Sequence, residues 1–470
     1  MTLVRLRDQV LPAPGRRDLP EPKTLRAMLG PGIILAGLSI GSGEFVLWPR
    51  LTAEWGLVMF WACWIGVSMQ FFMNMEIERY TLATGESAVI GFVRLSRSFG
   101  PIFLVCGTLP WIWPGWASGA ATLLSWEIGG PVTLYAVGGL FLCGLLLSLG
   151  PVVYRTVEGI QIGLVTVIFV LLVGLAIVVV RGEALLALAS GALRVGHIPE
   201  GIDLPLLLGA LAFAGAGGTV NLAQSNYIRD KGYGMGRWMG RLTSPFTGRE
   251  ESTGETGFVF EGDPENLARW RVWWRRANLE HALTFYLLSL LSLALFCLIT
   301  YSLFATPGEV SPGFGFIQDQ AGILGERYGA LAQHCFVWGG IAVLFSTELA
   351  LLDAVSRVVA DLVKVTFLSQ QHRWSLSRLY FAFLWGFILF GVAILAVGLT
   401  QPLQLLIVSA SLNAIVMFLY SGLLLVLNLN AFRPPIRPGW SRIAALVAAF
   451  GFFGYFSFLT IGSQIQRLTG

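Results

Sequence analysis

A single carboxylate inside a strongly apolar stretch is the first residue of this sequence that suggests chemistry. Glu44 follows Gly41, Ser42 and Gly43 in the segment IILAGLSIGSGEFV, residues 33–46. A carboxylate near the centre of a bilayer is costly, and clustered glycines favour interruption of a helix. An interrupted, charged membrane helix is typical of a binding site near the membrane midplane. The alternative is a glycine-lined packing face from which Glu44 reaches an interfacial partner.

A second glycine cluster repeats this arrangement further along the chain. Gly215, Gly217 and Gly218 lie in the segment LLLGALAFAGAGGTVNLAQSNYIRDKG, and Thr219 and Asn221 come directly after them. The same segment continues with the polar residues Gln224, Ser225 and Asn226. Unwound backbone at the glycines would expose carbonyl groups that can bind a cation, and the half-helix ends would supply dipoles. The two clusters together predict a transport site where two interrupted helices meet.

Further polar residues lie deep in other apolar segments. Glu348 has no oppositely charged residue close to it in sequence, so it is, together with Glu44, a candidate for relaying protons. Asp353 and Arg357 are four residues apart and can pair on one helical face, which is a structural role. Asn413 lies in another apolar segment, residues 403–428. It either faces the predicted site or joins two helices.

The composition indicates that membrane helices position these residues. The chain has 470 residues, is 55% hydrophobic and 12% charged, and its mean hydropathy is +0.71, whereas soluble domains are about a quarter charged. A spanning helix needs about 20 apolar residues. Eleven segments meet this condition, at about 30–50, 56–78, 100–125, 132–152, 157–180, 205–228, 279–304, 331–365, 377–399, 403–428 and 441–465. The sequence therefore predicts an all-α polytopic membrane protein.

Several classes of function are disfavoured by what the sequence contains. The five cysteines lie in apolar runs without CxxC spacing, and no two of the four histidines have ligand spacing. We therefore expect no disulfide framework, no zinc site and no cofactor. Without a nucleophile motif or a catalytic domain, an enzyme is not expected. The net charge of +4 is not interpreted as binding to nucleic acid, and the expected partners are the lipid bilayer and a transported ion or solute. The sequence does not indicate an oligomeric state.

The distribution of basic residues predicts the orientation in the membrane. If the N-terminus is cytoplasmic, 26 of the 31 Lys and Arg residues fall on the cytoplasmic side and five on the outer side. Basic residues collect on the cytoplasmic side of membrane proteins. We therefore expect a multi-pass protein of the cell (inner) membrane with a cytoplasmic N-terminus and an external C-terminus.

The eleven segments suggest a division of the chain. Residues 1–28 form a cytoplasmic tail, residues 29–180 a first five-helix repeat, residues 205–428 a second and inverted repeat, and residues 441–466 an eleventh helix. The second repeat contains a cytoplasmic loop, residues 231–278. Its KGYGMGRWMG start has neither the preceding strand nor the spacing of a nucleotide-binding loop. Its ARWRVWWRRAN end is either a helix on the anionic inner leaflet or a solvated connector.

The chain resembles the Nramp family of proton-coupled divalent-metal transporters over roughly residues 28–430. The resemblance is closest at GPGIILAGLSIGSGEF, ERYTLATGES and GGTVNLAQSNYIRDKG, and it implies a LeuT-type fold of two inverted five-helix repeats. The ligands typical of the family are changed. Gly41, Ser42, Gly43 and Glu44 occupy the positions of its Asp-Pro-Gly-Asn motif. Gly218, Thr219 and Val220 occupy those of its Met-Pro-His motif, and Gly215 that of its carbonyl ligand.

These replacements leave a site of oxygen donors. Without the methionine thioether, carboxylate and carbonyl oxygens favour hard ions such as Mg2+ or Mn2+. We predict a secondary-active transporter of a divalent cation, with proton coupling left open. The metal ligands are Glu44 and the Gly215 carbonyl, and the proton relay is Glu44 and Glu348. The wider substrate site is predicted to contain Gly41, Ser42, Glu44, Gly215, Gly218, Thr219, Asn221 and Asn413. The alternative cargo is a small organic cation or an amino-acid-like solute.

Overall fold

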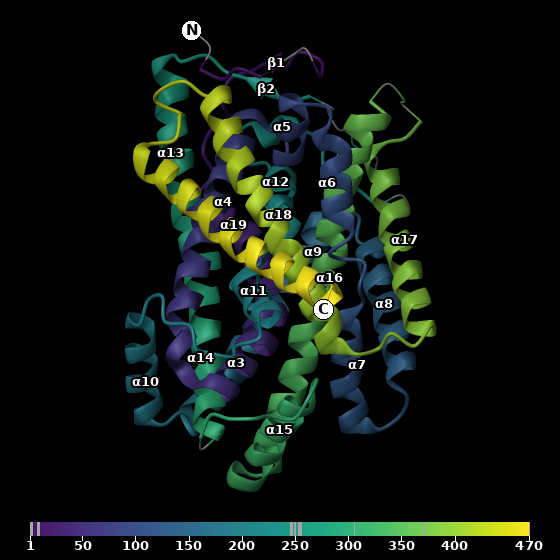
Figure 1. The fold of residues 1–470 in the computed structure, drawn as a ribbon. Helices are drawn as coiled ribbons and strands as arrows, with labels where there is room; N and C mark the ends of the chain where they lie inside the picture. Colours follow the sequence, from purple (N-terminus) through teal and green to yellow (C-terminus); the bar gives the residue numbers. More distant parts are fainter. Residues whose placement is uncertain are drawn as a thin grey trace.

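Long helices that run roughly parallel form most of the molecule in the computed structural model (Figure 1). The structure describes residues 3–6, 10–244, 248, 251, 256–304, 306–369, 371 and 373–469. The N-terminal segment, the two short strands and the start of α13 lie at one end of the bundle, and α10, α3 and α15 lie at the other (Figure 1). The all-α architecture predicted from composition is confirmed.

The helices of the first half of the chain are α1 (Leu25–Met28), α2 (Pro31–Ser39), the π-helix η1 (Ile40–Leu47), α3 (Trp48–Trp55), the 3₁₀ helix η2 (Gly56–Met59), α4 (Phe60–Thr84), α5 (Ala88–Leu95), α6 (Phe99–Thr108), α7 (Gly115–Ile128), α8 (Val132–Leu149), α9 (Val153–Val179) and α10 (Gly182–Leu193). Those of the second half are α11 (Leu204–Ala212), α12 (Gly218–Lys231), the 3₁₀ helix η3 (Gly234–Trp238), α13 (Pro264–His281), the π-helix η4 (Ala282–Tyr286), α14 (Leu287–Leu303), α15 (Gly315–Tyr328), α16 (Ala330–Phe367), α17 (Leu376–Ala396), α18 (Pro402–Ala431) and α19 (Trp440–Thr469). The two strands are β1 (Gly15–Arg16) and β2 (Phe258–Val259), and they pair in parallel.

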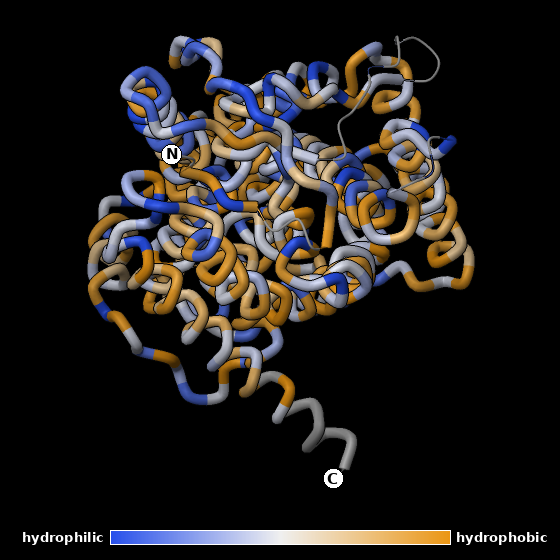
Figure 2. Tube along the Cα trace, turned by 90° about the horizontal axis from the view of Figure 1, so that it is seen from above, coloured by the Kyte–Doolittle hydropathy of each residue, from blue (hydrophilic) through white to orange (hydrophobic). Residues whose placement is uncertain are grey.

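The chain is a multi-pass membrane protein. Within the described residues, eight helical stretches are long and apolar enough to cross a bilayer. One of them, Pro31–Thr84, contains two of the predicted segments. The third and sixth predicted segments are each divided into two shorter helices. Many large apolar side chains on the outside are exposed, such as Val170 at 67% and Ile177 at 79%. Figure 2 shows hydrophobic residues around much of the circumference of the bundle, as expected for lipid contact.

The prediction of one continuous third helix over residues 100–125 is wrong. Helix α6 ends at Thr108 and α7 begins at Gly115. Pro110 and Pro114 lie in the gap between them. Proline lacks an amide donor and its ring clashes with the preceding turn, so two prolines four residues apart interrupt the helix.

The two predicted midplane interruptions differ from one another. In the first helix the backbone stays helical through Gly41 and Gly43 but widens into the π-helix η1. The expectation of an unwound first helix is therefore wrong, although π-helical turns are themselves frequent at functional sites. In the sixth helix α11 stops at Ala212 and α12 starts at Gly218. That helix is broken, as the sequence predicts.

The N-terminal segment is tied to the loop of residues 231–278. Besides the β1–β2 pairing, the Leu19 amide donates to Asn266 Oδ1 at 2.8 Å and Trp273 Nε1 donates to the Pro20 carbonyl at 2.8 Å. Both Asn266 and Trp273 belong to α13, which continues through η4 into α14 as one helical stretch. The basic end of the loop is therefore an extension of a spanning helix, packed against the N-terminal segment. The boundaries of the two inverted repeats, 29–180 and 205–428, stay predictions.

Candidate functional site

The first and sixth helices cross where the sequence places their glycine clusters. A Cβ atom on Gly43 would lie 1.8 Å from the carbonyl oxygen of Phe213, which belongs to the break between α11 and α12. A Cβ atom on Gly41 would lie 2.0 Å from Thr347 Oγ1 of α16. Neither Gly41 nor Gly43 has a positive φ. These glycines are therefore required for close approach, because any side chain would force the helices apart.

Glu44 is fully buried at this crossing and points toward α14. Its Oε2 atom accepts a hydrogen bond from Ser292 Oγ. The hydroxyls of Ser39 and Ser289, whose oxygens are 2.9 Å apart, flank the same carboxylate. Within the part of the chain that the structure describes, Glu44 Oε1 has no hydrogen-bond partner and no Lys or Arg pairs with this side chain. The result is a buried carboxylate with one oxygen available and hydroxyl groups around it.

The break in the sixth helix is held by Gln70 of α4. Gln70 Nε2 donates to the carbonyls of Ala212 at 2.9 Å and Ala214 at 3.0 Å. Gln70 Oε1 accepts from the Gly217 amide at 3.0 Å and from Asn221 Nδ2 at 3.2 Å. A broken helix in a membrane must satisfy its freed backbone groups from neighbouring helices. One side chain serves four groups here, so the break is an ordered structure.

Asn413 and Thr219 join α18 to the start of α12. The Thr219 amide donates to Asn413 Oδ1 at 3.4 Å, and a Cβ atom on Gly218 would lie 1.7 Å from the same oxygen. Thr219 Oγ1 accepts from Trp111 Nε1 at 3.1 Å. Asn221 Nδ2 also donates to Tyr420 of α18 at 3.0 Å. The sequence left two roles open for Asn413, and these contacts support the second, in which it joins two helices.

An aromatic cluster covers the break. The ring of Phe213 lies 5.8 Å from that of Trp111 and 6.0 Å from that of Trp116, and the two tryptophan rings are 5.6 Å apart. Trp111 comes from the interruption of the third helix and Trp116 from the start of α7. The interruption of the third helix thus brings two tryptophans to the interruption of the sixth.

Glu348 lies on a different side of the crossing from Glu44. It is only 4% exposed, and its Oε2 accepts from the Ala117 amide at 3.2 Å. Ala117 is in the first turn of α7, where free backbone amides and the helix dipole favour a negative charge. Glu44 faces serines of α2 and α14 instead. The two carboxylates proposed as a relay have no direct contact.

A buried charge network joins α12 to α16 nearer the end of the bundle that holds the N-terminal segment. Arg357 pairs with Asp353 at 2.9 Å, as predicted from their spacing, and also with Asp230 of α12. Arg229 pairs with Asp361 at 3.1 Å. These charges are at most 4% exposed. Because a buried charge without its partner is strongly destabilising, the network fixes α12 against α16.

The predicted site residues therefore form two groups. Glu44 lies with Ser39, Ser289 and Ser292, whereas Gly215, Gly218, Thr219, Asn221 and Asn413 lie around the break of the sixth helix. Gly41 packs against α16, and the Ser42 side chain is outside the described residues. Gly43 and Phe213 connect the two groups.

Sequence reasoning missed the residues that complete both groups. Gln70 and Tyr420 are polar side chains within membrane helices, and a polar group at such a depth is the signal that could have drawn attention to them. Ser289 and Ser292 are three residues apart, so they share one helical face. Among the described residues, no three or more His, Cys, Asp or Glu side chains gather closely enough to hold a metal ion. An ion bound here would depend on hydroxyl, amide and carbonyl oxygens besides Glu44.

Comparison with known proteins identifies the fold. No protein-family model matches the sequence, and no curated protein does. The structure is similar to that of a mutant of the Eremococcus coleocola manganese transporter, with a TM-score of 0.71 and 17% identity over 97% of this chain and 91% of that one. It is also similar to the same transporter in complex with an aromatic bis-isothiourea substituted compound, with a TM-score of 0.70 and 17% identity over 100% of this chain and 92% of that one. The LeuT-type fold implied by the Nramp resemblance is confirmed, and the resemblance holds at the level of the fold.

Proposed function

We propose that this protein is a secondary-active transporter of a divalent cation, with Glu44 as the charged ligand. The observation that carries the proposal is the environment of that carboxylate. It is fully buried, one of its oxygens has no hydrogen-bond partner among the described residues, and it lies where the first helix crosses the break of the sixth. Ionisable groups inside a membrane are costly, so one without an ion-pair partner is a candidate for a functional site. The manganese-transporter fold supports the same cargo class.

The donors around Glu44 favour a hard ion such as Mg2+ or Mn2+. The hydroxyls of Ser39, Ser289 and Ser292 and the carboxylate itself are oxygen ligands, which hard divalent cations prefer. The backbone carbonyl of Gly215, a residue of the second group, is also part of the proposed ligand set. Mg2+ retains several waters when it is bound by proteins, which fits a site with a single carboxylate.

Transport on this fold would proceed by alternating access around the crossing. The cytoplasmic face is proposed to be the end with the N-terminal segment, in the cell membrane, because 26 of 31 basic residues lie on that side of the predicted topology. The α12–α16 charge network would close the path on that side. Glu44 and Glu348 are the proposed proton carriers, each acting without direct contact with the other.

A small organic cation is the second candidate cargo. The observation in its favour is the aromatic cluster of Trp111, Trp116 and Phe213 beside the break. Aromatic faces attract organic cations, most strongly when water is excluded. The cluster would then form the recognition surface, and Glu44 would neutralise the charge of the solute.

Uptake into proteoliposomes tests the proposal. Mn2+, Mg2+, Ca2+ and small amines are compared for the wild type, Glu44→Gln, and the matched control Glu183→Gln, which changes an exposed carboxylate on α10. We expect uptake of a divalent cation that Glu44→Gln abolishes and Glu183→Gln retains. Equal metal uptake by the wild type and Glu44→Gln would overturn the ligand assignment. Uptake of amines alone, lost in Trp111→Ala, would establish the second candidate instead.

A further inference from the structure

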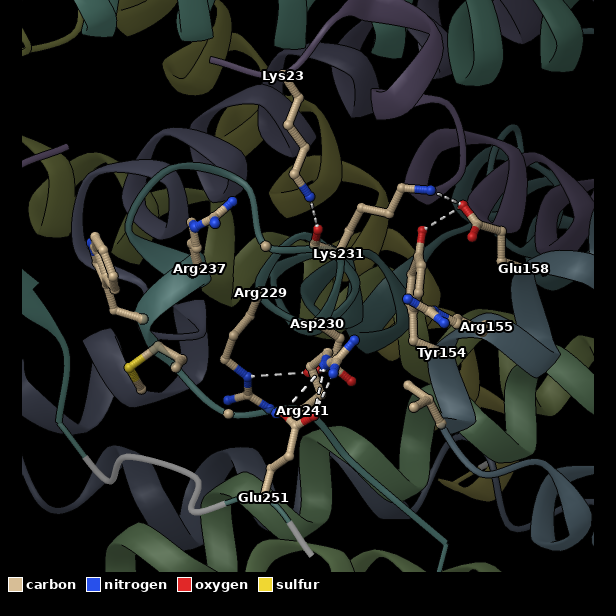
Figure 3. Close-up of a pocket in the computed structure, with 16 residues that line it drawn as sticks. Lys23, Tyr154, Arg155, Glu158, Arg229, Asp230, Lys231, Arg237, Arg241 and Glu251 are labelled. Carbon is tan, nitrogen blue, oxygen red and sulfur yellow. Dashed lines mark hydrogen bonds and ion pairs between the residues drawn. The ribbon is translucent and has the colours of Figure 1, made fainter. Parts of the chain in front are cut away.

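A basic cavity of about 620 Å³ opens at the end of the bundle that holds the N-terminal segment (Figure 3). Three separate parts of the chain form it: the N-terminal segment at Lys23, the start of α9 at Arg155, and the residues from α12 into the following loop at Arg229–Arg241, together with Glu251 of the same loop. Six basic and three acidic side chains line it. The described lining is therefore net positive.

The three carboxylates are already paired. Glu158 pairs with Lys231, and Glu251 accepts from Arg241 Nε at 3.0 Å. Asp230 lies 3.6 Å from Arg229 and also pairs with Arg357. These pairs neutralise three of the six basic groups. The remaining three, Lys23, Arg155 and Arg237, carry the excess charge.

The unneutralised groups converge on the cavity from its three sides (Figure 3). Within the described residues neither Arg155 nor Arg237 has an ion-pair partner, and the Lys23 ammonium donates only to the Lys231 carbonyl. Burial, with repulsion from Lys231 and Arg237, lowers the pKa of Lys23 from its usual value. A bound anion would relieve this repulsion, so the charge of the lining favours a negatively charged ligand.

The glycine-rich stretch after α12 also lines this cavity. Gly232, Gly236 and Gly240 are all at its wall. It follows a helix and has no preceding strand, so it is not a nucleotide-binding loop. Glycines nevertheless allow a ligand to approach the backbone closely.

A separate apolar groove of about 640 Å³ lies further along α9. Ile162, Thr166, Val173 and Ile177 line this groove. They follow Arg155 by 7, 11, 18 and 22 residues, so all share its helical face. Along the axis Ile162 lies about 10 Å from Arg155 at 1.5 Å per residue. Positive charge and an apolar channel thus lie in succession on one face of a spanning helix.

We propose that this face binds an anionic phospholipid, with the headgroup phosphate in the basic cavity and an acyl chain in the groove along α9. The charge of the cavity complements the phosphate, and basic pockets beside spanning helices on the cytoplasmic side suit anionic headgroups. A free phosphate compound would use the same cavity but would leave the groove without a role. The site is separate from the crossing of the first and sixth helices.

Titration of phosphatidylglycerol into the purified full-length protein in neutral detergent tests the headgroup site. The shift in unfolding temperature reports binding, and phosphatidylcholine, which is zwitterionic and has no net charge, is the comparison. We expect the double variant Arg155→Gln/Arg237→Gln to weaken phosphatidylglycerol binding about 30-fold, because each basic residue near a membrane surface contributes about 1 kcal/mol. Arg155→Lys/Arg237→Lys should retain most of the binding.

The matched control is Arg271→Gln/Arg275→Gln on the exposed face of α13, which removes the same charge outside the cavity. Equal effects of the two glutamine doubles, or equal stabilisation by phosphatidylcholine, would overturn the proposal.

The groove is tested by filling it. A Cβ atom on Gly174, in the groove, or on Gly163, outside it, meets nothing within 4 Å. Gly174→Leu should therefore fold, occupy the groove and weaken phosphatidylglycerol binding about tenfold, whereas Gly163→Leu should not. If soluble glycerol phosphate stabilises the wild type as well as the lipid does and Gly174→Leu has no effect, the ligand is a free phosphate compound and the lipid assignment is wrong.

Discussion

The two glycine clusters at the midplane have the same sequence signature but different backbones. Gly215, Gly217 and Gly218 all have positive φ values, of +123°, +76° and +55°, and the sixth helix breaks there. Gly41 and Gly43 do not, and the first helix continues as a π-helix. At the sixth helix the glycines serve the conformation of the backbone. At the first they make room for Thr347 and the Phe213 carbonyl.

The side chain of a neighbouring glutamine explains why only the sixth helix breaks. Gln70 reaches the sixth helix and satisfies the carbonyls and amide that the break releases. The corresponding glutamine near the first helix, Gln161 of α9, instead bonds to Ser346 of α16, at 2.8 Å for each of two hydrogen bonds. Without a side chain to satisfy freed backbone groups, unwinding the first helix would be costly. A glycine cluster therefore permits a break, and a polar partner decides whether it forms.

Replacing Gln70, which holds the break of the sixth helix, should cause the largest change in the free energy of unfolding. Gln70→Leu leaves two carbonyls and one backbone amide without partners and removes one of the two acceptors of Asn221 Nδ2. Each unsatisfied buried group costs about 1–3 kcal/mol. We expect a loss of about 4 kcal/mol in unfolding free energy, measured by thermal unfolding in detergent. Gln161→Leu is the matched control and should cost about half as much. Equal losses would mean that the break does not depend on Gln70.

Adding one methyl group to the first helix should have the next largest effect. In Gly43→Ala the new Cβ atom would overlap the Phe213 carbonyl, which cannot rotate away, so the helices must separate. Overpacking of this kind costs about 3 kcal/mol at its upper end. Gly163→Ala, in open space on α9, should be neutral or slightly stabilising. Thermal unfolding of both variants would show whether close approach is the role of Gly43; similar midpoints would argue against it.

Neutralising Glu44 should have the smallest effect on folding and the opposite sign. A buried carboxylate without a cationic partner is destabilising, so Glu44→Gln should raise the free energy of unfolding by about 1 kcal/mol. Gln70→Glu should instead lower the free energy of unfolding, since it removes the two hydrogen bonds that Gln70 Nε2 donates and adds a buried charge. If Glu44→Gln destabilises the protein, Glu44 has a structural role and the packing-face interpretation gains support.

Features set by the local sequence were predictable, and contacts between distant parts of the chain were not. Apolar segment lengths indicated the helices, and the three glycines at 215–218 indicated where the sixth helix could break, because glycine is a poor helix former. The third helix could have been divided correctly from Pro110 and Pro114. The grouping of Glu44 with Ser289 and Ser292 could not be predicted, because residues about 250 positions apart meet only through packing. The same holds for Gln70, whose role depends on which face of α4 meets α11 and α12.

The pairing of β1 with β2 bears on the order in which the protein assembles. Gly15 leaves the ribosome early, but its partner Phe258 is made only after the sixth helix. Contacts between residues so far apart in sequence form late, because the loop they close must be ordered first. The N-terminal segment therefore cannot dock until α13 has been made. The hydrogen bond from Trp273 Nε1 to the Pro20 carbonyl can therefore form only in a chain whose first six membrane helices have already been synthesised.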